Sequence, residues 1–143
     1  MKTVRDILRL KGEEVYTVSP GETVFEAIRR LADLGVGSLV VVDQGRPVGL
    51  FSERDYTCKV ALEGRSSRET PVEEVMTRQL LVVTPDTTTN ECMALMTENR
   101  IRHLPVVEEG RLAGLVSIGD IVKDIIDEQQ FVIEQLEKYI YYS

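Results

Sequence analysis

Residues 45–55 read GRPVGLFSERD, and residues 110–120 read GRLAGLVSIGD. The two strings share a Gly-Arg start, a central Gly-Leu pair and a final Ser-x-x-Asp. Extending the comparison outward, residues 15–60 lie on residues 80–125 without a gap, with 13 identities over 46 positions. A gapless register across several turns indicates an internal duplication. Two copies are too few for a solenoid, so the sequence predicts a closed pair with pseudo-two-fold symmetry.

Each copy has the pattern of a β-α-β-β-α unit. A short apolar strand ends at a Ser-Pro or Thr-Pro, an amphipathic helix follows, and two Val-rich strands flank a glycine-containing turn. In the first copy, Ser19 and Glu22 have the spacing of a capping box at the start of the helix. The strands expected in the two copies are 15–18, 38–43, 47–51, 80–83, 103–108 and 112–116. Four helices are expected: one that ends at Leu34, one over 53–62, one over 88–99 and one that starts at Ile118. The sequence therefore predicts a mixed α/β (α+β) fold.

Short amphipathic segments precede both copies, and a polar segment lies between them. The apolar residues of these leading segments are Val4, Ile7 and Leu8 in the first, and Val72, Val75 and Met76 in the second. Residues 63–70 are polar and rich in turn formers, which is typical of a linker. We therefore expect residues 1–62 to form the first motif with its N-terminal segment. Residues 71–143 form the second motif with an extended C-terminal helix, and the whole is one module.

The final helix carries apolar residues along its whole length, and we expect it to run from Ile118 to about Tyr141. A helix of about 24 residues spans roughly 36 Å, more than a small body is expected to cover. We therefore expect its far half to pack on another chain, in a homodimer. The alternative is a helix folded back on its own body. Tyr139, Tyr141 and Tyr142 are expected in the interface or the tail.

The composition of the 143-residue chain excludes several classes of protein. Its net charge is −7 and no basic stripe is present, which argues against duplex nucleic acid as a partner. No apolar run approaches the length of about 18 residues that indicates a membrane helix. The N-terminus has no apolar signal core, and Cys58 and Cys92 lack disulfide or metal-site spacing. We expect a cytoplasmic protein with structural thiols and no metal.

The sequence also lacks the parts of an enzyme. It contains no Walker-type lysine loop, no HExxH and no GxSxG. One histidine and two isolated cysteines leave few ways to build a nucleophile with its base. We predict that the protein is not an enzyme and has no catalytic residues.

The duplicated strings and two others resemble the cystathionine β-synthase (CBS) domain. The strings that carry the resemblance are GLFSERD at 49–55, GLVSIGD at 114–120, NRIRHLPVV at 99–107 and PVEEVMT at 71–77. The resemblance covers nearly the whole chain and implies a stand-alone pair of motifs packed sheet to sheet. It also implies disc-like homodimers, and clefts that bind AMP, ADP, ATP, NAD(H) or S-adenosylmethionine as effectors. Such modules are mostly regulatory and not catalytic.

The Ser-x-x-Asp strings have a functional and a structural interpretation. In the family, the Asp binds ribose and the Ser or Thr contacts phosphate, which implies these roles for Asp55 with Ser52 and for Asp120 with Ser117. A helix N-terminus does present free N–H groups to a phosphate. Helix capping alone accounts for the same residues, because the Ser caps and the Asp favours the helix dipole.

Basic residues differ between the two copies. The resemblance implies that Arg102 and His103 point at ligand phosphate, whereas the alternative is a surface pair at the edge of a strand. The corresponding residues of the first copy are the uncharged Gly37-Ser38. Arg54 is expected to help the first cleft, and its counterpart is Gly119. The sequence therefore predicts two unequal clefts, with the second better built for phosphate.

Three further residues lie where the first strand of each copy ends. Thr17, Ser19 and Thr84 are expected beside the cleft, where backbone groups can contact adenine. Ordinary turn chemistry explains the same residues equally well.

Two functions remain. The first is a regulatory, energy-sensing module that binds an adenine nucleotide and modulates an unknown partner protein. The alternative is a ligand-independent homodimerisation or scaffold module with vestigial clefts. The presence of Asp55, Asp120 and Arg102 together favours the sensor.

Overall fold

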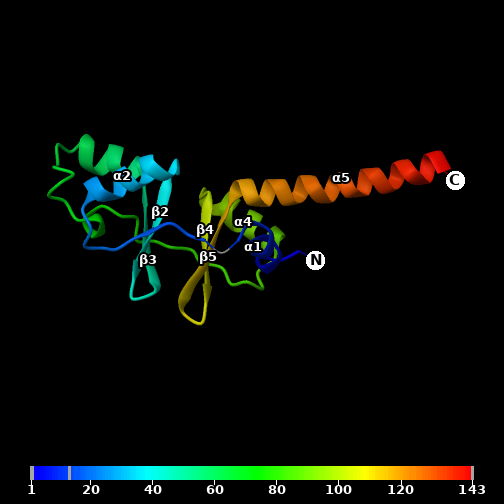
Figure 1. The fold of residues 1–143 in the computed structure, drawn as a ribbon, viewed down its shortest axis with the longest axis horizontal. Coiled ribbons are helices and arrows are strands. Elements are labelled where there is room, and N and C mark those ends of the chain that lie inside the picture. The colour runs from blue at the N-terminus through cyan, green and yellow to red at the C-terminus, as the bar shows by residue number, and fades with distance from the viewer. Residues whose placement is uncertain (1, 13, 143) are drawn as a thin grey trace.

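The computed structural model describes residues 2–12 and 14–142. The elements, in chain order, are α1 (Val4–Lys11), β1 (Thr17–Val18), α2 (Val24–Leu34), β2 (Ser38–Asp43), β3 (Arg46–Ser52), α3 (Glu53–Tyr56), the π-helical η1 (Thr57–Ala61), the 3-10 turn η2 (Val72–Glu74), α4 (Thr89–Asn99), β4 (His103–Glu108), β5 (Arg111–Ser117) and α5 (Ile118–Tyr142). Figure 1 shows the two hairpins in the middle of the body, with α2 outside the first and α1 and α4 outside the second. The predicted mixed α/β fold with two repeated units is confirmed.

Each half is organised around a β-hairpin. In the first half, β1 runs parallel to β2, and β2 pairs antiparallel with β3. In the second half, β4 pairs antiparallel with β5, and a single parallel bridge from Val83 to Val106 stands where β1 stands in the first. The turn residues Gln44 and Gly45 have φ values of 51° and 82°, and those of Glu109 and Gly110 are 53° and 79°. These left-handed conformations suit a tight hairpin turn, which is why the glycines recur.

The hairpins of the two halves also touch each other. The backbone N–H of Leu112 donates to the carbonyl of Gly45 at 3.0 Å. Strands β3 and β5 are in contact, so the two sheets meet across the pseudo-two-fold axis. The space on either side of this contact is where clefts between the halves form.

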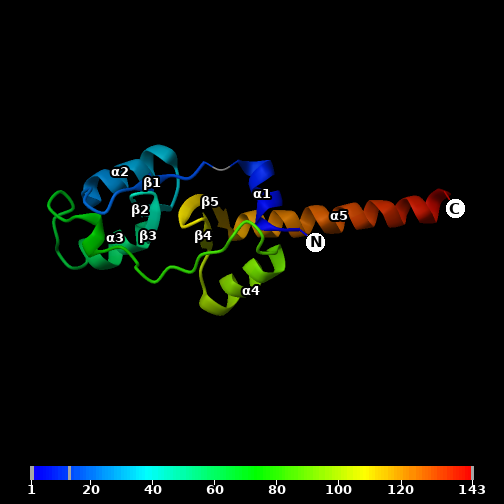
Figure 2. The ribbon, with the colours of Figure 1, turned by 90° about the horizontal axis from the view of Figure 1, so that it is seen from below.

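Each leading segment packs in the core of the other half, and not in the core of the half that follows it in the sequence. Val4, Ile7 and Leu8 of α1 lie in the core of the second half, with residues of α4, β4, β5 and α5. Val72 of η2 and Val75, directly after it, lie in the core of the first half, with residues of α2, β2 and β3. Figure 2 shows α1 beside α5, away from the first half. The N-terminal segment, which the sequence groups with the first motif, therefore completes the second core.

The crossing of the leading segments is fixed by matching backbone hydrogen bonds. The N–H of Val4 donates to the carbonyl of Thr87 at 2.8 Å, and the N–H of Val72 donates to the carbonyl of Glu22 at 2.8 Å. Glu22 and Thr87 are equivalent positions of the duplication. The two leading segments are therefore held by equivalent backbone hydrogen bonds, although the segments themselves differ in length and helix type.

Two equivalent glycines allow the leading segments to approach the sheets. A Cβ atom on Gly114 would lie 2.8 Å from a methyl carbon of Leu8, and one on Gly49 would lie 2.6 Å from the sulfur of Met76. A Cβ atom at either position would force the side chain of Leu8 or Met76 to move, so each leading segment packs on a bare patch of backbone. This explains the central glycine shared by the two strings that define the repeat.

The start of α2 differs from the sequence-based expectation. Its N-cap is Thr23, whose hydroxyl accepts a hydrogen bond from the N–H of Glu26 at 3.2 Å. Ser19 does not cap the helix; its N–H donates to the Glu22 carboxylate at 2.6 Å and closes a turn before it. The prediction was wrong because the Pro20-Gly21 turn delays the helix, and Thr23 then offers a side-chain oxygen at the right place.

The last helix leaves the body. Figure 1 shows α5 projecting beyond α4 and α1. Ile121 is fully buried and Ile125 packs on the second core, whereas every residue from Ile126 to Tyr139 is exposed. The helix therefore does not fold back on its own body. Among the described residues, no helix is long and apolar enough to cross a membrane.

The assignment of α1 to the second core gives a test. Leu8→Ala should lower the free energy of unfolding by about 2–5 kcal/mol, because it leaves a cavity against Gly114. Leu10→Ala is the matched control on the same helix; Leu10 is 84% exposed, and its loss should cost less than about 0.5 kcal/mol. Denaturant unfolding measures both, and equal effects would contradict the packing of α1.

Candidate functional site

Two cavities lie between the halves. The Ser117 cleft has a volume of about 310 Å³ and is lined by Lys11, Glu14, Val15, Tyr16, Val36, Gly37, Ser38, His103, Leu115 and Ser117. The Leu50 cleft has a volume of about 460 Å³ and is lined by Leu50, Thr77, Gln79, Leu80, Leu81, Asn99, Ile101 and His103. Each takes residues from both halves, and Leu50 and Leu115 are equivalent positions. The clefts are therefore pseudo-symmetric counterparts.

The polar residues of the Ser117 cleft come from several elements of both halves. Ser117 ends β5 and caps α5, His103 begins β4, and Lys11 ends α1. Ser38 begins β2 and is the equivalent of His103. The cleft thus collects hydroxyl groups, an imidazole, an ammonium group and, from Glu14, a carboxylate, which together suit a polar ligand.

The Ser117–Asp120 pair forms a reciprocal cap at the start of α5. The N–H of Ser117 donates to Oδ2 of Asp120 at 2.8 Å, and the N–H of Asp120 donates to Oγ of Ser117 at 3.1 Å. Lys11 Nζ donates to the same Oδ2 at 2.7 Å and to the carbonyl of Leu115 at 2.9 Å. Among the described residues, none donates to Oδ1 of Asp120. One carboxylate oxygen is therefore available to a ligand.

The charge of Asp120 is stabilised by these contacts. Burial would raise the pKa of this carboxyl, but the hydrogen bonds from Lys11 and from Ser117 outweigh burial and hold the pKa below its usual value. Asp120 lines a neighbouring cavity of about 350 Å³ together with Lys11. Lys11 lines both this cavity and the Ser117 cleft, so it lies between the carboxylate and the cleft.

In the equivalent Ser52–Asp55 pair, both carboxylate oxygens have partners within the protein. Oδ2 of Asp55 accepts from the N–H and the hydroxyl of Ser52 at 2.9 and 3.0 Å. Oδ1 accepts from the Thr77 hydroxyl at 3.1 Å and pairs with Lys59 Nζ at 2.9 Å. Asp55 is also buried. Both of its oxygens are occupied by the protein, so the two copies differ at the residue that the sequence treats as equivalent.

His103 lies at the centre of the site. It lines both clefts. Burial lowers its pKa, and the nearby charges of Lys11 and Arg102 act in the same direction, while Asp120 opposes them. The imidazole of the free protein is therefore held towards its neutral form, and a ligand phosphate would favour its protonation.

The two predicted arginines lie apart from these cavities. Arg54 and Arg102 are exposed, and neither is among the residues that line the three cavities described above. The backbone of Arg102 has a structural role, because its carbonyl accepts from the N–H of Ile118 at 2.8 Å and fixes β4 beside the start of α5. Their contacts with phosphate stay predictions.

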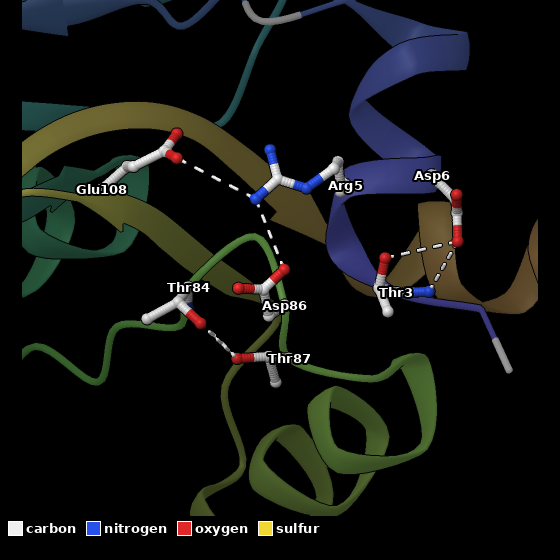
Figure 3. A network of polar contacts seen from close by, with 7 residues as sticks. All are labelled: Thr3, Arg5, Asp6, Thr84, Asp86, Thr87 and Glu108. Carbon is white, nitrogen blue, oxygen red and sulfur yellow. Dashed lines mark hydrogen bonds and ion pairs between the residues drawn. The ribbon is translucent and has the colours of Figure 1, made fainter.

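The three residues expected beside adenine also lie outside the cavity linings. The carbonyl of Thr17 accepts from Arg30 at 2.6 Å, and Ser19 belongs to the turn before α2. The N–H of Thr84 donates to the hydroxyl of Thr87 at 3.1 Å. Figure 3 shows these two threonines near the ion pair between Arg5 and Asp86, where α1 meets the second half. Their role in binding stays a prediction.

Sequence reasoning missed Lys11 and Tyr16. Tyr16 lies in the predicted strand 15–18 and directly precedes Thr17, one of the residues expected beside adenine. Lys11 gave no signal in the sequence, because 109 positions separate it from Asp120. Only the crossing of α1 to the second half brings the two together.

The described residues contain no group of three or more His, Cys, Asp or Glu side chains that could hold a metal ion. Cys58 is exposed and Cys92 is buried. Burial raises the pKa of the Cys92 thiol to about 11, so this thiol stays protonated in the second core.

Known proteins share the fold and much of the sequence. The CBS domain matches residues 4–59 and 72–127. CBS domain-containing protein CBSX3, mitochondrial, of Arabidopsis thaliana is 37% identical over 147 residues, which cover 96% of this chain and 71% of that protein. A solved structure of a protein with CBS domains from Burkholderia ambifaria MC40-6 is 49% identical, with a TM-score of 0.82 over 90% of this chain and 96% of that one. The CBS domain pair of protein MJ0100, solved in complex with 5′-methylthioadenosine and S-adenosyl-L-methionine, is 25% identical, with a TM-score of 0.77 over 90% and 98% of the two chains.

The lowered pKa of His103 predicts a pH dependence. A histidine whose folded pKa lies below the usual value of about 6.5 binds fewer protons when folded than when unfolded. The free energy of unfolding should therefore decrease as the pH falls below about 6.5, and be unaffected by this group well above it. His103→Gln should remove this part of the dependence.

Because His103 is the only histidine, NMR titration of its ring protons gives the folded pKa without ambiguity. A measured pKa at or above that of an unfolded reference peptide would contradict the burial of this ring. Denaturant unfolding of both variants across the same pH range checks the effect on stability.

Proposed function

This chain belongs to the CBS-domain family, as a tandem pair, and on that premise we propose that it is a regulatory module that binds an adenosine ligand in the Ser117 cleft. The ligand is AMP, ADP, ATP, NAD(H) or S-adenosylmethionine, and the bound state modulates a partner protein. The observation that carries the proposal is the oxygen of Asp120 that accepts no hydrogen bond from the described residues, at the start of α5. Lys11, which donates to the other oxygen, lines both the Ser117 cleft and the neighbouring cavity of Asp120.

The ribose contact is proposed for Asp120. Vicinal ribose hydroxyls are donors, and an ionised carboxylate with a vacant oxygen is a strong acceptor for them. Asp120 keeps its charge because its pKa is lowered. Asp55 is less suited, since a ligand would have to displace Thr77 or Lys59 from it.

The phosphate contact is proposed for the start of α5, with Ser117, His103 and Lys11. A long helix presents free N–H groups and a positive dipole at its N-terminus. α5 covers 25 residues, whereas α3 at the equivalent place covers 4 before the π-helical η1.

The adenine contact is proposed for the wall formed by Val15, Tyr16 and Val36, which line the same cleft. Apolar and aromatic side chains can cover the faces of the base, and backbone groups of this irregular segment can bind its edge. Thr17, Ser19 and Thr84, with Arg54, Arg102, Ser52 and Asp55, remain candidate contacts of the same ligand class.

We propose that Lys11 links ligand binding to the response of the partner protein. This residue ends α1, which belongs to the second core, and it begins the segment that leads into the first half. A ligand whose phosphate binds the Lys11 ammonium, while its ribose binds the vacant oxygen of Asp120, would act on this connection. Such a ligand changes the relation between the halves only to the extent that it binds one arrangement better than the other.

A second candidate is a ligand-independent scaffold that dimerises through α5. The feature that favours it is the exposed apolar face of α5. In this interpretation the ion pair with Lys11 is the only role of the Asp120 carboxylate, and the clefts are vestigial. Homodimerisation itself is compatible with both functions.

A ligand panel separates the two candidates. Thermal unfolding with AMP, ADP, ATP, NADH and S-adenosylmethionine should show one ligand that raises the melting temperature. A ligand at about a hundredfold excess over its Kd adds about 2.7 kcal/mol, or roughly 5–10 °C for a chain of this size. No rise with any of the five would favour the scaffold.

Asp120→Ala tests the site itself. The loss of a charge-assisted hydrogen bond should weaken binding of the selected ligand by at least about 1.5 kcal/mol, more than tenfold in Kd. Glu134→Ala is the matched control, because Glu134 is an exposed acid on the same helix and lies outside the cavities described above, and the affinity of this variant should be unchanged. Calorimetry on folded samples measures both, and equal affinities of the two variants would exclude Asp120 as a ligand contact.

A further inference from the structure

Two residues at and just after the end of α1 give the Ser117 cleft its charge. Lys11 and Glu14 both line this cleft, and among its described lining residues they are the only ammonium and the only carboxylate. Lys11 Nζ is already paired with Oδ2 of Asp120 at 2.7 Å. Among the described residues, no cation forms an ion pair with the carboxylate of Glu14, which is exposed. The cleft therefore sets an ammonium group that is already neutralised beside an unpaired carboxylate.

The equivalent position of the other cleft is uncharged. Gln79 follows Glu14 by 65 positions, in the register of the duplication, and lines the Leu50 cleft. The described lining of the Leu50 cleft contains no Lys, Arg, Asp or Glu. Glutamine has nearly the shape of glutamate without its charge, so the fold accommodates a neutral amide at this position. The charge of Glu14 is therefore a property of one cleft alone.

A second or third phosphate group in the Ser117 cleft would meet the Glu14 carboxylate without a free cation to balance it. Arg54 and Arg102 line neither cleft, and His103, whose pKa is lowered by burial, adds little positive charge. Like charges repel each other, less strongly where water and salt screen them. The volume of about 310 Å³ is also near the lower end of the range for ligand pockets, about 300–1,000 Å³. Charge and size both favour a small ligand with little negative charge.

We propose that Glu14 is a specificity-determining residue of the Ser117 cleft, which excludes polyphosphates and restricts the cleft to adenosine ligands that carry a single anionic group. Of the ligands named above, AMP carries one phosphate group and S-adenosylmethionine carries one carboxylate, whereas ADP, ATP and NAD(H) carry more than one phosphate group. The single anionic group binds Lys11, and the ribose binds Asp120. The inference rests on the proposed function and narrows its ligand class.

Calorimetry without divalent cations tests the role of Glu14. The wild-type protein should bind AMP or S-adenosylmethionine more tightly than ATP. Glu14→Gln should reduce this preference by at least about threefold in the ratio of the Kd values, because it removes a like charge from the cleft. The reduction should become smaller at high ionic strength, since salt screens exposed charges.

Gln79→Glu is the matched control, because it makes the reverse substitution at the equivalent position of the Leu50 cleft. It should leave the preference over ATP unchanged. A shift of the same size as that of Glu14→Gln, in the opposite direction, would overturn the assignment to Glu14, since the net charge of the chain would then account for both variants.

The sign of the effect distinguishes the two ligands of the class. S-adenosylmethionine also carries a sulfonium and an ammonium group, which a carboxylate attracts. Glu14→Gln should therefore weaken its binding by about threefold. The same variant should leave the binding of AMP unchanged or tighter, because AMP carries no positive group that Glu14 could attract.

The results also keep this inference apart from the proposed function. A wild-type protein that binds ATP as tightly as AMP and S-adenosylmethionine would overturn only the role of Glu14, as would a Glu14→Gln variant with an unchanged preference. A wild-type protein that binds none of the ligands would overturn both proposals. Glu14 is exposed, so the variant should fold normally, and thermal unfolding without ligand checks this.

Discussion

The exchange of leading segments between the halves is the constraint on which the rest of the structure depends. The N–H of Val4 bonds to Thr87, and that of Val72 bonds to Glu22, both at 2.8 Å. These bonds satisfy backbone groups that would otherwise be buried without partners. They also hold Val4 and Val72 fully buried in cores formed mostly by distant residues. Neither core is complete without its leading segment, so the two halves form one cooperative unit.

The same exchange shapes the candidate site. Because α1 packs on the second half, its last residue, Lys11, reaches Asp120 and the carbonyl of Leu115. Residues 14–16 must then return to the first half, and Val15 and Tyr16 become one wall of the Ser117 cleft. The residues that hold the halves together therefore also line the cleft. A ligand there would act on the connection between the halves and not only on a surface pocket.

The duplication produced two Ser-x-x-Asp helix caps whose surroundings differ. Asp55 is closed by Thr77 and Lys59, whereas Asp120 keeps one oxygen without a donor among the described residues. The following helices differ as well, since α3 gives way to the π-helical η1 and α5 continues beyond the body. One copy has thus become mainly structural in its contacts, while the other combines an accessible carboxylate with a long helix.

The sequence by itself determined the local architecture. The glycine turns at 45 and 110, the strand pairs around them and the caps at Ser52 and Ser117 all depend on residues within a few positions of each other. The 65-residue repeat then fixed their order. Only the tertiary structure decided which half each leading segment joins, which Asp stays accessible, and that Thr84 closes a turn with Thr87. The physical reason is that these contacts join distant parts of the chain or depend on competing partners. A pair such as Lys11 and Asp120, 109 positions apart, leaves no periodic trace in the sequence.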